Sequence, residues 1–296
     1  MPDHKQGQAQ AQVQVQVREK AERSGWAAQA GVFLAVAFVA AGICGALQPA
    51  TGIPPEVVQL TQFGPALAVA AVALLWPART KDRLAGTLPA RAGRPAGRAP
   101  RSATGRTALL LTPALIIALS AGGILLTSGT LPATNPPALA HPLALLVAAQ
   151  LLGACAEEIG WRCYLQPLLR TRFGPVTASA LVGTVWGLWH VPALAQGPAY
   201  AAGFLTATVA MSVILGLALE RVRSNRLLLA GGFHTLVNLG LLLVTDETSP
   251  AAAPMMVFGA ACLAAALPWL ARARARARRT ASAPDRITAA TAHAPR

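Results

Sequence analysis

Residues 143–169 read LALLVAAQLLGACAEEIGWRCYLQPLL, an apolar run of membrane-spanning length that holds two adjacent carboxylates, Glu157 and Glu158. A transmembrane helix needs about 20 mostly apolar residues. An ionisable side chain at the bilayer centre costs at least about 2.5–3.5 kcal/mol, so acids within a span mark a functional site by default. This stretch therefore predicts both a membrane helix and a site inside it.

The composition extends the membrane prediction to the whole chain. Its 296 residues are 54% hydrophobic and only 12% charged, whereas a soluble domain is about 25% charged. Apolar stretches recur along the sequence, so we expect an all-α fold, a polytopic membrane helix bundle with about eight transmembrane helices. The expected spans are residues 26–47, 56–77, 107–128, 143–165, 176–195, 200–220, 227–245 and 252–270.

The distribution of basic residues predicts the orientation of these spans. With the N-terminus inside, all 25 Lys and Arg residues lie on the cytoplasmic side or, for Arg162, near that end of a helix. The positive-inside rule then predicts that both termini are cytoplasmic. The net charge of +14 is explained by this topology and by contact with anionic inner-leaflet lipids, so we expect no nucleic-acid partner.

The chain divides into one membrane domain and polar flanking segments. The basic loop and the tail are rich in Arg, Ala and Pro, so irregular structure is expected there. The leader is polar and rich in Gln, which argues against a cleavable signal peptide. The expected parts are a leader over 1–24, a bundle over 25–270 with a basic cytoplasmic loop at 78–106 and a core at 143–245 that holds the embedded polar residues, and a basic cytoplasmic tail over 271–296.

The first embedded polar cluster is an EExxxR motif formed by Glu157, Glu158 and Arg162. Glu158 and Arg162 are four residues apart, so they share a helix face in the favoured order for an ion pair. Glu157 projects about 100° away and cannot share that arginine equally. We therefore expect Glu158 to be held structurally and Glu157 to be available as a general base, unless both acids serve only helix packing.

Two further clusters lie on later spans. His190 occurs in GTVWGLWHVP, where Trp186 is one turn earlier and Gly183 and Gly187 allow close helix approach. Alone, it is also consistent with an interfacial histidine. His234 and Asn238, in GGFHTLVNLG, share one helix face and would alternatively form an interhelical hydrogen-bonding pair.

The remaining histidines and the cysteines are weaker candidates. His4 and His293 lie in the polar termini, and His141 precedes a proline at a predicted loop edge. The four cysteines lack metal-binding or disulfide spacing, so we interpret them as small buried hydrophobic residues. They are Cys44, Cys155, Cys163 and Cys262.

The ordered trio of EExxxR, aromatic-x-x-x-His and HxxxN on membrane helices resembles the CPBP family of intramembrane proteases. That family includes CAAX-processing endopeptidases and bacterial relatives linked to bacteriocin immunity. The resemblance covers about residues 143–245 and implies that Glu157 activates a water. It also implies that His190, His234 and Asn238 bind a metal or position the water and stabilise the oxyanion, with Glu158 and Arg162 in support. The second motif usually begins with Phe, and here it begins with Trp186.

Peptide hydrolysis requires an activated water, a base and stabilisation of an oxyanion. A zinc ion would supply the first and third, with Glu157, His190 and His234 as its ligands. The sequence contains no HExxH motif, and whether the metal or the glutamate dominates stays open. Depth raises a difficulty, because Glu157 and His234 each lie about 10–12 Å from the predicted cytoplasmic ends of their spans, whereas His190 lies about 20 Å from the end of its span.

Three functions compete at this stage. The first is an intramembrane endopeptidase acting on a peptide or membrane protein. The second is a non-catalytic immunity or scaffold protein of the same fold. The third is a proton-coupled transporter, although matching half-repeats with broken helices are not visible in the sequence. The Ala- and Arg-rich composition indicates a bacterial plasma-membrane protein, for which a prenylated substrate is not expected.

Overall fold

A computed structural model describes residues 25–55, 57–89, 103–131, 141–246 and 250–281. The regular structure within these ranges is entirely helical, which confirms the predicted all-α class. The leader at 1–24 and the tail beyond 281 lie outside the described residues. The elements are α2 (Trp26–Thr51), η1 (Leu60–Phe63), α3 (Gly64–Leu75), α4 (Pro77–Arg83), α5 (Ala103–Ser128), α6 (Leu143–Gly160), η3 (Trp161–Leu165), α7 (Gln166–Arg170), α8 (Pro175–Trp189), α9 (Val191–Leu194), α10 (Pro198–Leu219), α11 (Arg226–Leu241) and α12 (Ala252–Ala281).

Five helices in the described part of the chain are long and apolar enough to cross a membrane. Each one coincides with a predicted span, so the chain is a multi-pass membrane protein. These helices cover Trp26–Thr51, Gly105–Ser128, Leu143–Arg170, Pro198–Leu219 and Ala252–Thr280.

The other three predicted spans contain shorter helices. α3, α8 and α11 have 12, 15 and 16 residues, so even α11 reaches only about 24 Å against a hydrocarbon core of about 30 Å. α8 ends earlier than predicted because His190 leaves the helical region, with ψ 63°, just before Pro192. The number of crossings and their orientation therefore stay predictions.

Both basic segments are partly helical. α4 covers Pro77–Arg83 within the expected loop, of which residues 90–102 lie outside the described part. α12 continues to Ala281, so the irregular structure expected from residue 271 onward does not begin there. The reason is local, because Ala and Arg, which alternate over residues 271–278, are both strong helix formers.

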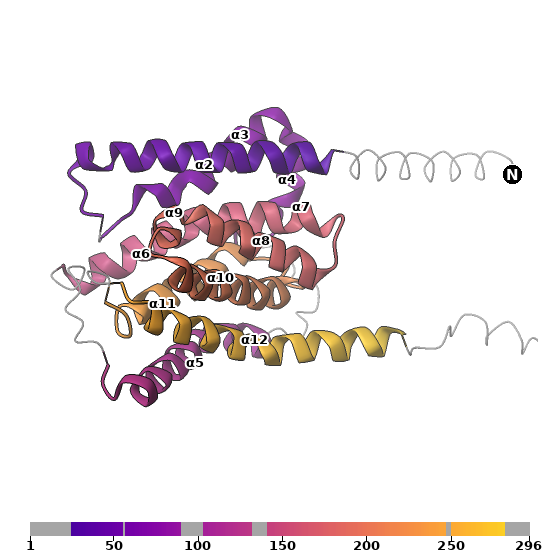
Figure 1. The fold of residues 1–296 in the computed structure, drawn as a ribbon. Coiled ribbons are helices and arrows are strands. Elements are labelled where there is room, and N and C mark those ends of the chain that lie inside the picture. The colour runs from indigo at the N-terminus through magenta and orange to yellow at the C-terminus, as the bar shows by residue number, and fades with distance from the viewer. Residues whose placement is uncertain (1–24, 56, 90–102, 132–140, 247–249, 282–296) are drawn as a thin grey trace, which may run out of the picture.

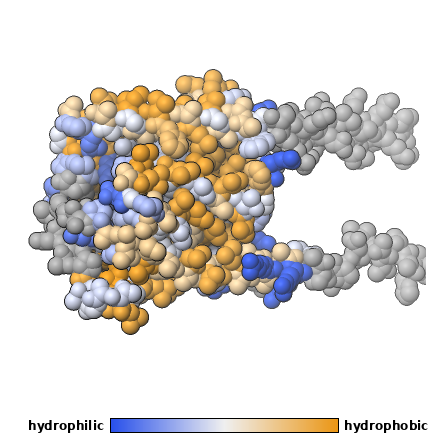
Figure 2. All heavy atoms as spheres, in the orientation of Figure 1, coloured by the Kyte–Doolittle hydropathy of each residue, from blue (hydrophilic) through white to orange (hydrophobic). Residues whose placement is uncertain are grey.

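The helices form a bundle with α10 at its interior. Figure 1 shows α2 and α3 along one side and α5 and α12 along the opposite side, with α6, α8, α10 and α11 between them. The most apolar window of α10 is 67% buried, whereas that of α2 is 22% buried. Figure 2 shows that apolar side chains dominate the outer face of this bundle. The first turn of α2 and the last turn of α12 lie at the same end (Figure 1), as termini on one side require.

Two close contacts fix the helices that carry the predicted site. α8 packs on α10 at Gly183, where an added Cβ would lie 2.6 Å from Val209 Cα. The start of α11 is held by backbone hydrogen bonds between residues 86–88 and 225–227, with N···O distances of 3.1–3.2 Å. We refer to this pairing as the 86–88 clip. It ties the first third of the chain to α11.

Candidate active site

Glu158 is the buried acid that links α6 to α11. Its Oε2 lies 3.2 Å from Arg162 Nε, and its Oε1 lies 3.1 Å from His234 Nδ1. The side chains of Glu158 and Arg162 are fully buried, and that of His234 is 5% exposed. The predicted ion pair with Arg162 is therefore present. The additional partner, His234, was not predicted from the sequence because it comes from another helix.

Arg162 lies in a local break of the α-helical pattern. The chain passes from α6 into η3, a π-helical turn over Trp161–Leu165, and then into α7. π-Helical turns are rare and are frequently found at functional sites. The sequence gives no sign of this turn, because its residues fit an ordinary helix equally well.

Glu157 is also buried, and it has a different partner. Its Oε2 accepts a hydrogen bond of 2.8 Å from Trp186 Nε1 on α8. This is the only hydrogen bond to the Glu157 carboxylate within the described residues, which leaves Oε1 without a protein partner there. Glu157 is thus less free than the sequence suggested, but one oxygen stays available to a water.

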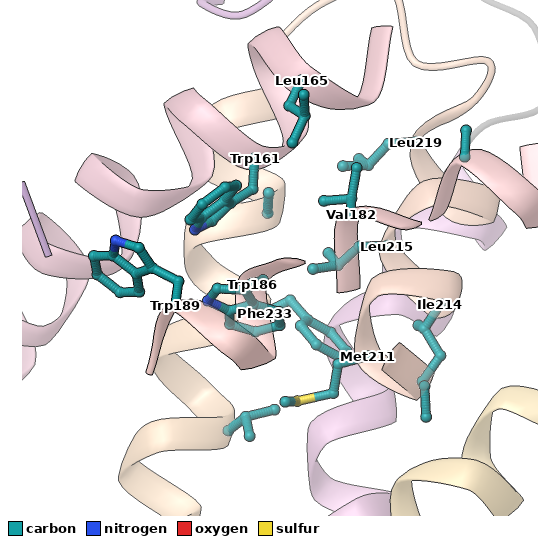
Figure 3. Close-up of a cluster of buried hydrophobic side chains, with 14 of the residues drawn as sticks. Trp161, Leu165, Val182, Trp186, Trp189, Met211, Ile214, Leu215, Leu219 and Phe233 are labelled. Carbon is teal, nitrogen blue, oxygen red and sulfur yellow. The ribbon is translucent and has the colours of Figure 1, made fainter. Parts of the chain in front are cut away.

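Trp186 makes a contribution that the sequence does not reveal. The Phe that usually begins this motif cannot donate a hydrogen bond, whereas the Trp186 indole donates to Glu157. Its ring also packs edge-on against His190 and His234, with centroids 6.0 and 5.1 Å apart. The Arg162 guanidinium lies over it at 4.9 Å. Figure 3 shows Trp186 within the buried apolar cluster that also contains Trp161, Phe233 and Met211.

His190 caps the C-terminal end of α8. Its Nδ1 lies 2.9 Å from the Trp186 carbonyl oxygen, and its ring packs against Trp189 and Phe204 at 4.9 and 5.1 Å. Trp189 is buried and its Nε1 donates to the Ala37 carbonyl at 3.3 Å. The histidine is therefore fixed by packing and by the end of its own helix.

Asn238 points to α6 as His234 does. Its Nδ2 donates to Gln150 Oε1 at 3.2 Å. Both His234 and Asn238 therefore make a contact with another helix, as the alternative interpretation of this pair expected. Gln150 was missed, although it lies seven residues, two helical turns, before Glu157 and is a polar residue in an apolar run.

The partners of the two histidines assign their tautomers. A carboxylate oxygen faces His234 Nδ1 and a carbonyl oxygen faces His190 Nδ1, so each neutral ring carries its proton on Nδ1. Each Nε2 then presents a lone pair. These nitrogens can accept a proton or a hydrogen bond from a water, or bind a metal.

The expected metal ligands do not form a complete set in this arrangement. Within the described residues, no three His, Cys, Asp or Glu side chains are grouped so that they could hold one ion. Glu157 and the two histidines contact Trp186 individually instead. The cysteines are free, and Cys163 and Cys262 are buried as expected, whereas Cys44 and Cys155 are half-buried.

The helix boundaries bring Glu157 and His190 to a similar depth, whereas His234 lies eight residues, or about 12 Å, after the start of α11 at Arg226. The span that holds Glu157 continues to Arg170, 13 residues and about 20 Å beyond it. His190 follows the start of α8 at Pro175 by 15 residues, or about 22 Å. The predicted end at residue 165 was too early because η3 and α7 continue the helix.

The same segment is similar to known proteins. Residues 139–240 match the family described as type II CAAX prenyl endopeptidase, Rce1-like. The chain is 33% identical over 111 residues to a CAAX prenyl protease 2 of Methanococcus maripaludis, which covers 33% of this chain and 41% of that protein. It is 27% identical over 109 residues to lysostaphin resistance protein A of Staphylococcus aureus, covering 37% of this chain and 26% of that protein. The chain thus spans less than half the length of either relative.

Proposed function

Residues 139–240 carry the Rce1-like domain of the CAAX protease family, and from this premise we propose that the chain is an intramembrane endopeptidase that uses Glu157 to activate water. The observation that supports this most is the pair of buried acids with separate partners. Glu158 holds His234, whereas Glu157 keeps one oxygen without a protein partner. We propose a peptide or membrane protein as the substrate and the bacterial plasma membrane as the location.

The proposed reaction uses this chain's own groups. A water donates a hydrogen bond to Glu157 Oε1 and another to a histidine Nε2. Glu157 takes one proton as the water oxygen bonds to the scissile carbonyl carbon. The amide of Asn238 then donates to the oxyanion. When the C–N bond breaks, Glu157 returns the proton to the leaving amine.

The role of Glu158 in this scheme is to position His234. Its carboxylate accepts from Nδ1 and so fixes both the ring orientation and the tautomer. Arg162 balances the buried charge of Glu158. Neither residue needs to contact the substrate.

The substitution Glu157→Gln tests the proposal. It preserves the shape of the side chain and its bond from Trp186 but removes the base, so we expect cleavage to fall by about 10²–10⁴-fold. The measurement is quantitative proteomics of membranes that carry either the unmodified chain or this variant, in which the substrate accumulates uncut only with the variant. Asp246→Asn, which changes a carboxylate outside the site, serves as the control. An unchanged set of cleaved products in the Glu157 variant would contradict the proposal.

A second candidate function follows from the staphylococcal relative. Its name states resistance to lysostaphin, which fits the alternative of a non-catalytic membrane protein that protects a cell but does not itself exclude cleavage. The same variant separates the two functions. Protection that survives Glu157→Gln would support the non-catalytic function, and protection lost together with cleavage would support the endopeptidase.

Zinc as a cofactor stays a prediction from the family resemblance. Elemental analysis of protein purified without chelators tests it. About one zinc per chain, lost in both His190→Ala and His234→Ala, would support a bound ion. Full activity in protein that contains no zinc would remove zinc from the proposal.

A further inference from the structure

The candidate site has one buried end and one half-exposed end. The two acids, Arg162 and His234 are at most 5% exposed, whereas His190 and Asn238 are half-buried. His190 caps the end of α8, and Asn238 lies one turn beyond His234 toward the end of α11. α8 and α11 end, and α6 begins, toward the end of the bundle opposite the start of α2 and the end of α12 (Figure 1). We refer to it as the α9 end, because α9 follows α8 there.

Toward the opposite end, large apolar side chains fill the space next to the acids. All five residues of η3 are buried, and Trp161 and Tyr164 are 0% exposed. Phe33 of α2 packs on both rings, with centroids 5.6 and 5.2 Å apart. Figure 3 shows Leu165 and Leu215 in the same buried cluster as Trp161. This layer separates the acids from the end at which α2 begins.

A cavity of about 240 Å³ between the ends of α7 and α10 and the start of α11 stops short of the acids. Among the described residues of the candidate site, Arg162 alone lines it. The Arg162 side chain is buried, pairs with Glu158 and lies over the ring of Trp186. It therefore closes the cavity on the side of the acids.

The α9 end, in contrast, presents polar groups that keep accessible surface. Asn238 donates to Gln150 at 3.2 Å, and both residues are half-buried. Gln150 Nε2 and Asn238 Oδ1 have no further partner among the described residues, and neither atom is enclosed. α9, which follows His190, contains no buried residue. Lipid cannot form hydrogen bonds with these amides, so water or a polar chain has to reach them.

We propose that water and substrate reach Glu157 from the α9 end, and that this end faces the outside of the cell. The loops predicted to lie outside contain no Lys or Arg, and two of them, 48–55 and 196–199, adjoin the α9 end. The substrate is then an extracytoplasmic segment of a membrane protein or an exported peptide, whose backbone the amides of Gln150 and Asn238 bind. The substrate rests on the proposed function, whereas the direction of access is testable without any cleavage.

Single cysteines on α6 test the direction of access. They are introduced into the full-length chain without its four native cysteines. The probe is a charged, membrane-impermeant methanethiosulfonate, which reacts with the thiolate and so requires water. We expect Gln150→Cys to react in intact spheroplasts and to stay unlabelled in inverted vesicles. Asn238→Cys, on the facing helix, should react in the same preparation.

Leu152→Cys is the matched control. Leu152 lies two residues after Gln150, about 200° around α6, and is 57% exposed on the outer surface of the bundle. Because lipid covers that surface, Leu152→Cys should stay unlabelled from either side. Equal labelling of Leu152→Cys would overturn the proposal, because reaction would then require no opening. Reaction of Gln150→Cys and Asn238→Cys only in inverted vesicles, or in neither preparation, would also overturn it.

The cleavage sites of the substrates separate this proposal from the proposed function. Substrates that accumulate uncut with Glu157→Gln should carry their cleavage sites in extracytoplasmic segments. Cleavage sites in cytoplasmic segments would overturn outer access but support the endopeptidase. Labelling of Gln150→Cys from outside, without any accumulated substrate, would support the direction of access and contradict the proposed function.

Discussion

Trp186 contacts four of the six residues assigned to the candidate site. It donates to Glu157, lies under the Arg162 guanidinium and packs against His190 and His234. A single side chain from α8 thus joins groups carried by α6, η3 and α11. The indole N–H is its only polar group, so the orientation of the ring is set by Glu157.

Replacement of Trp186 by the Phe that is usual in this motif tests the effect of its hydrogen bond separately from the effect of its ring packing. Trp186→Phe keeps an aromatic ring but removes the donor to Glu157, worth about 1.5–3 kcal/mol for a charged acceptor. We expect kcat to fall by about tenfold or more, with little change in KM, once a substrate is available for kinetic measurement.

Trp76→Phe is the control, since Trp76 ends α3 and lies outside the site. An unchanged kcat in Trp186→Phe would show that the hydrogen bond to Glu157 has no part in the reaction. Equal losses in both variants would point to a general loss of folded protein.

The sequence predicted one contact of the candidate site but not the contacts between helices. Spacing alone identified the pair of Glu158 and Arg162, because both lie on one helix. The bonds from Trp186 to Glu157 and from Asn238 to Gln150 join different helices. A single sequence carries no information on which helices become neighbours, so these partners appear only in the structure.

At the scale of the helix, the contact of α8 with α10 positions Trp186. Gly183 lies one turn before Trp186, and a Cβ there would meet Val209 Cα, Ser212 Cβ and the Thr208 carbonyl oxygen at 2.6–2.8 Å. The close approach expected from the glycines of this motif is confirmed.

Gly183→Ala should therefore push α8 away from α10. We expect it to destabilise the protein by roughly 1–3 kcal/mol through overpacking, and to lower activity because Trp186 moves. The measurement is the thermal unfolding temperature of the purified protein. Gly122→Ala is a matched control, because no atom lies within 4 Å of an added Cβ at Gly122 in α5. Equal unfolding temperatures for the two variants would contradict the packing argument.

Helix ends were predicted less well than helix positions. Hydropathy located the five helices of the described residues that are long enough to cross a membrane, but it ended one of them at residue 165, although the helix continues through η3 and α7 to Arg170. It also extended α8 beyond His190. Hydropathy averages over a window, whereas a helix ends at one residue with a particular backbone conformation, here His190 before Pro192.

At the scale of the whole molecule, the basic residues predict a cytoplasmic location for both termini. Thr51 ends α2 and Thr280 lies near the end of α12, and both are exposed. The rule for positive residues places Thr280 inside the cell and Thr51 outside it.

Single cysteines introduced at these two positions test the orientation. In a background without the four native cysteines, a membrane-impermeant maleimide should label Thr51→Cys in intact spheroplasts and Thr280→Cys in inverted vesicles. The parent protein without cysteines gives the baseline. Labelling of Thr280→Cys in intact spheroplasts would reverse the predicted topology.

The 86–88 clip has a consequence for the order of events on the ribosome. Gly86 and Arg226, which are bonded in this contact, are 140 residues apart (226 − 86), and synthesis proceeds at about 5–20 residues per second, so the first waits about 7–30 s for the second. Glu158 and Arg162 are only one helical turn apart in the chain. The bond between Glu158 and His234, in contrast, requires the synthesis of 76 more residues after Glu158. A nascent chain therefore contains the paired acids without their histidine. The complete site forms only after α11 has been synthesised and its first turn has bonded to residues 86–88, which are synthesised much earlier.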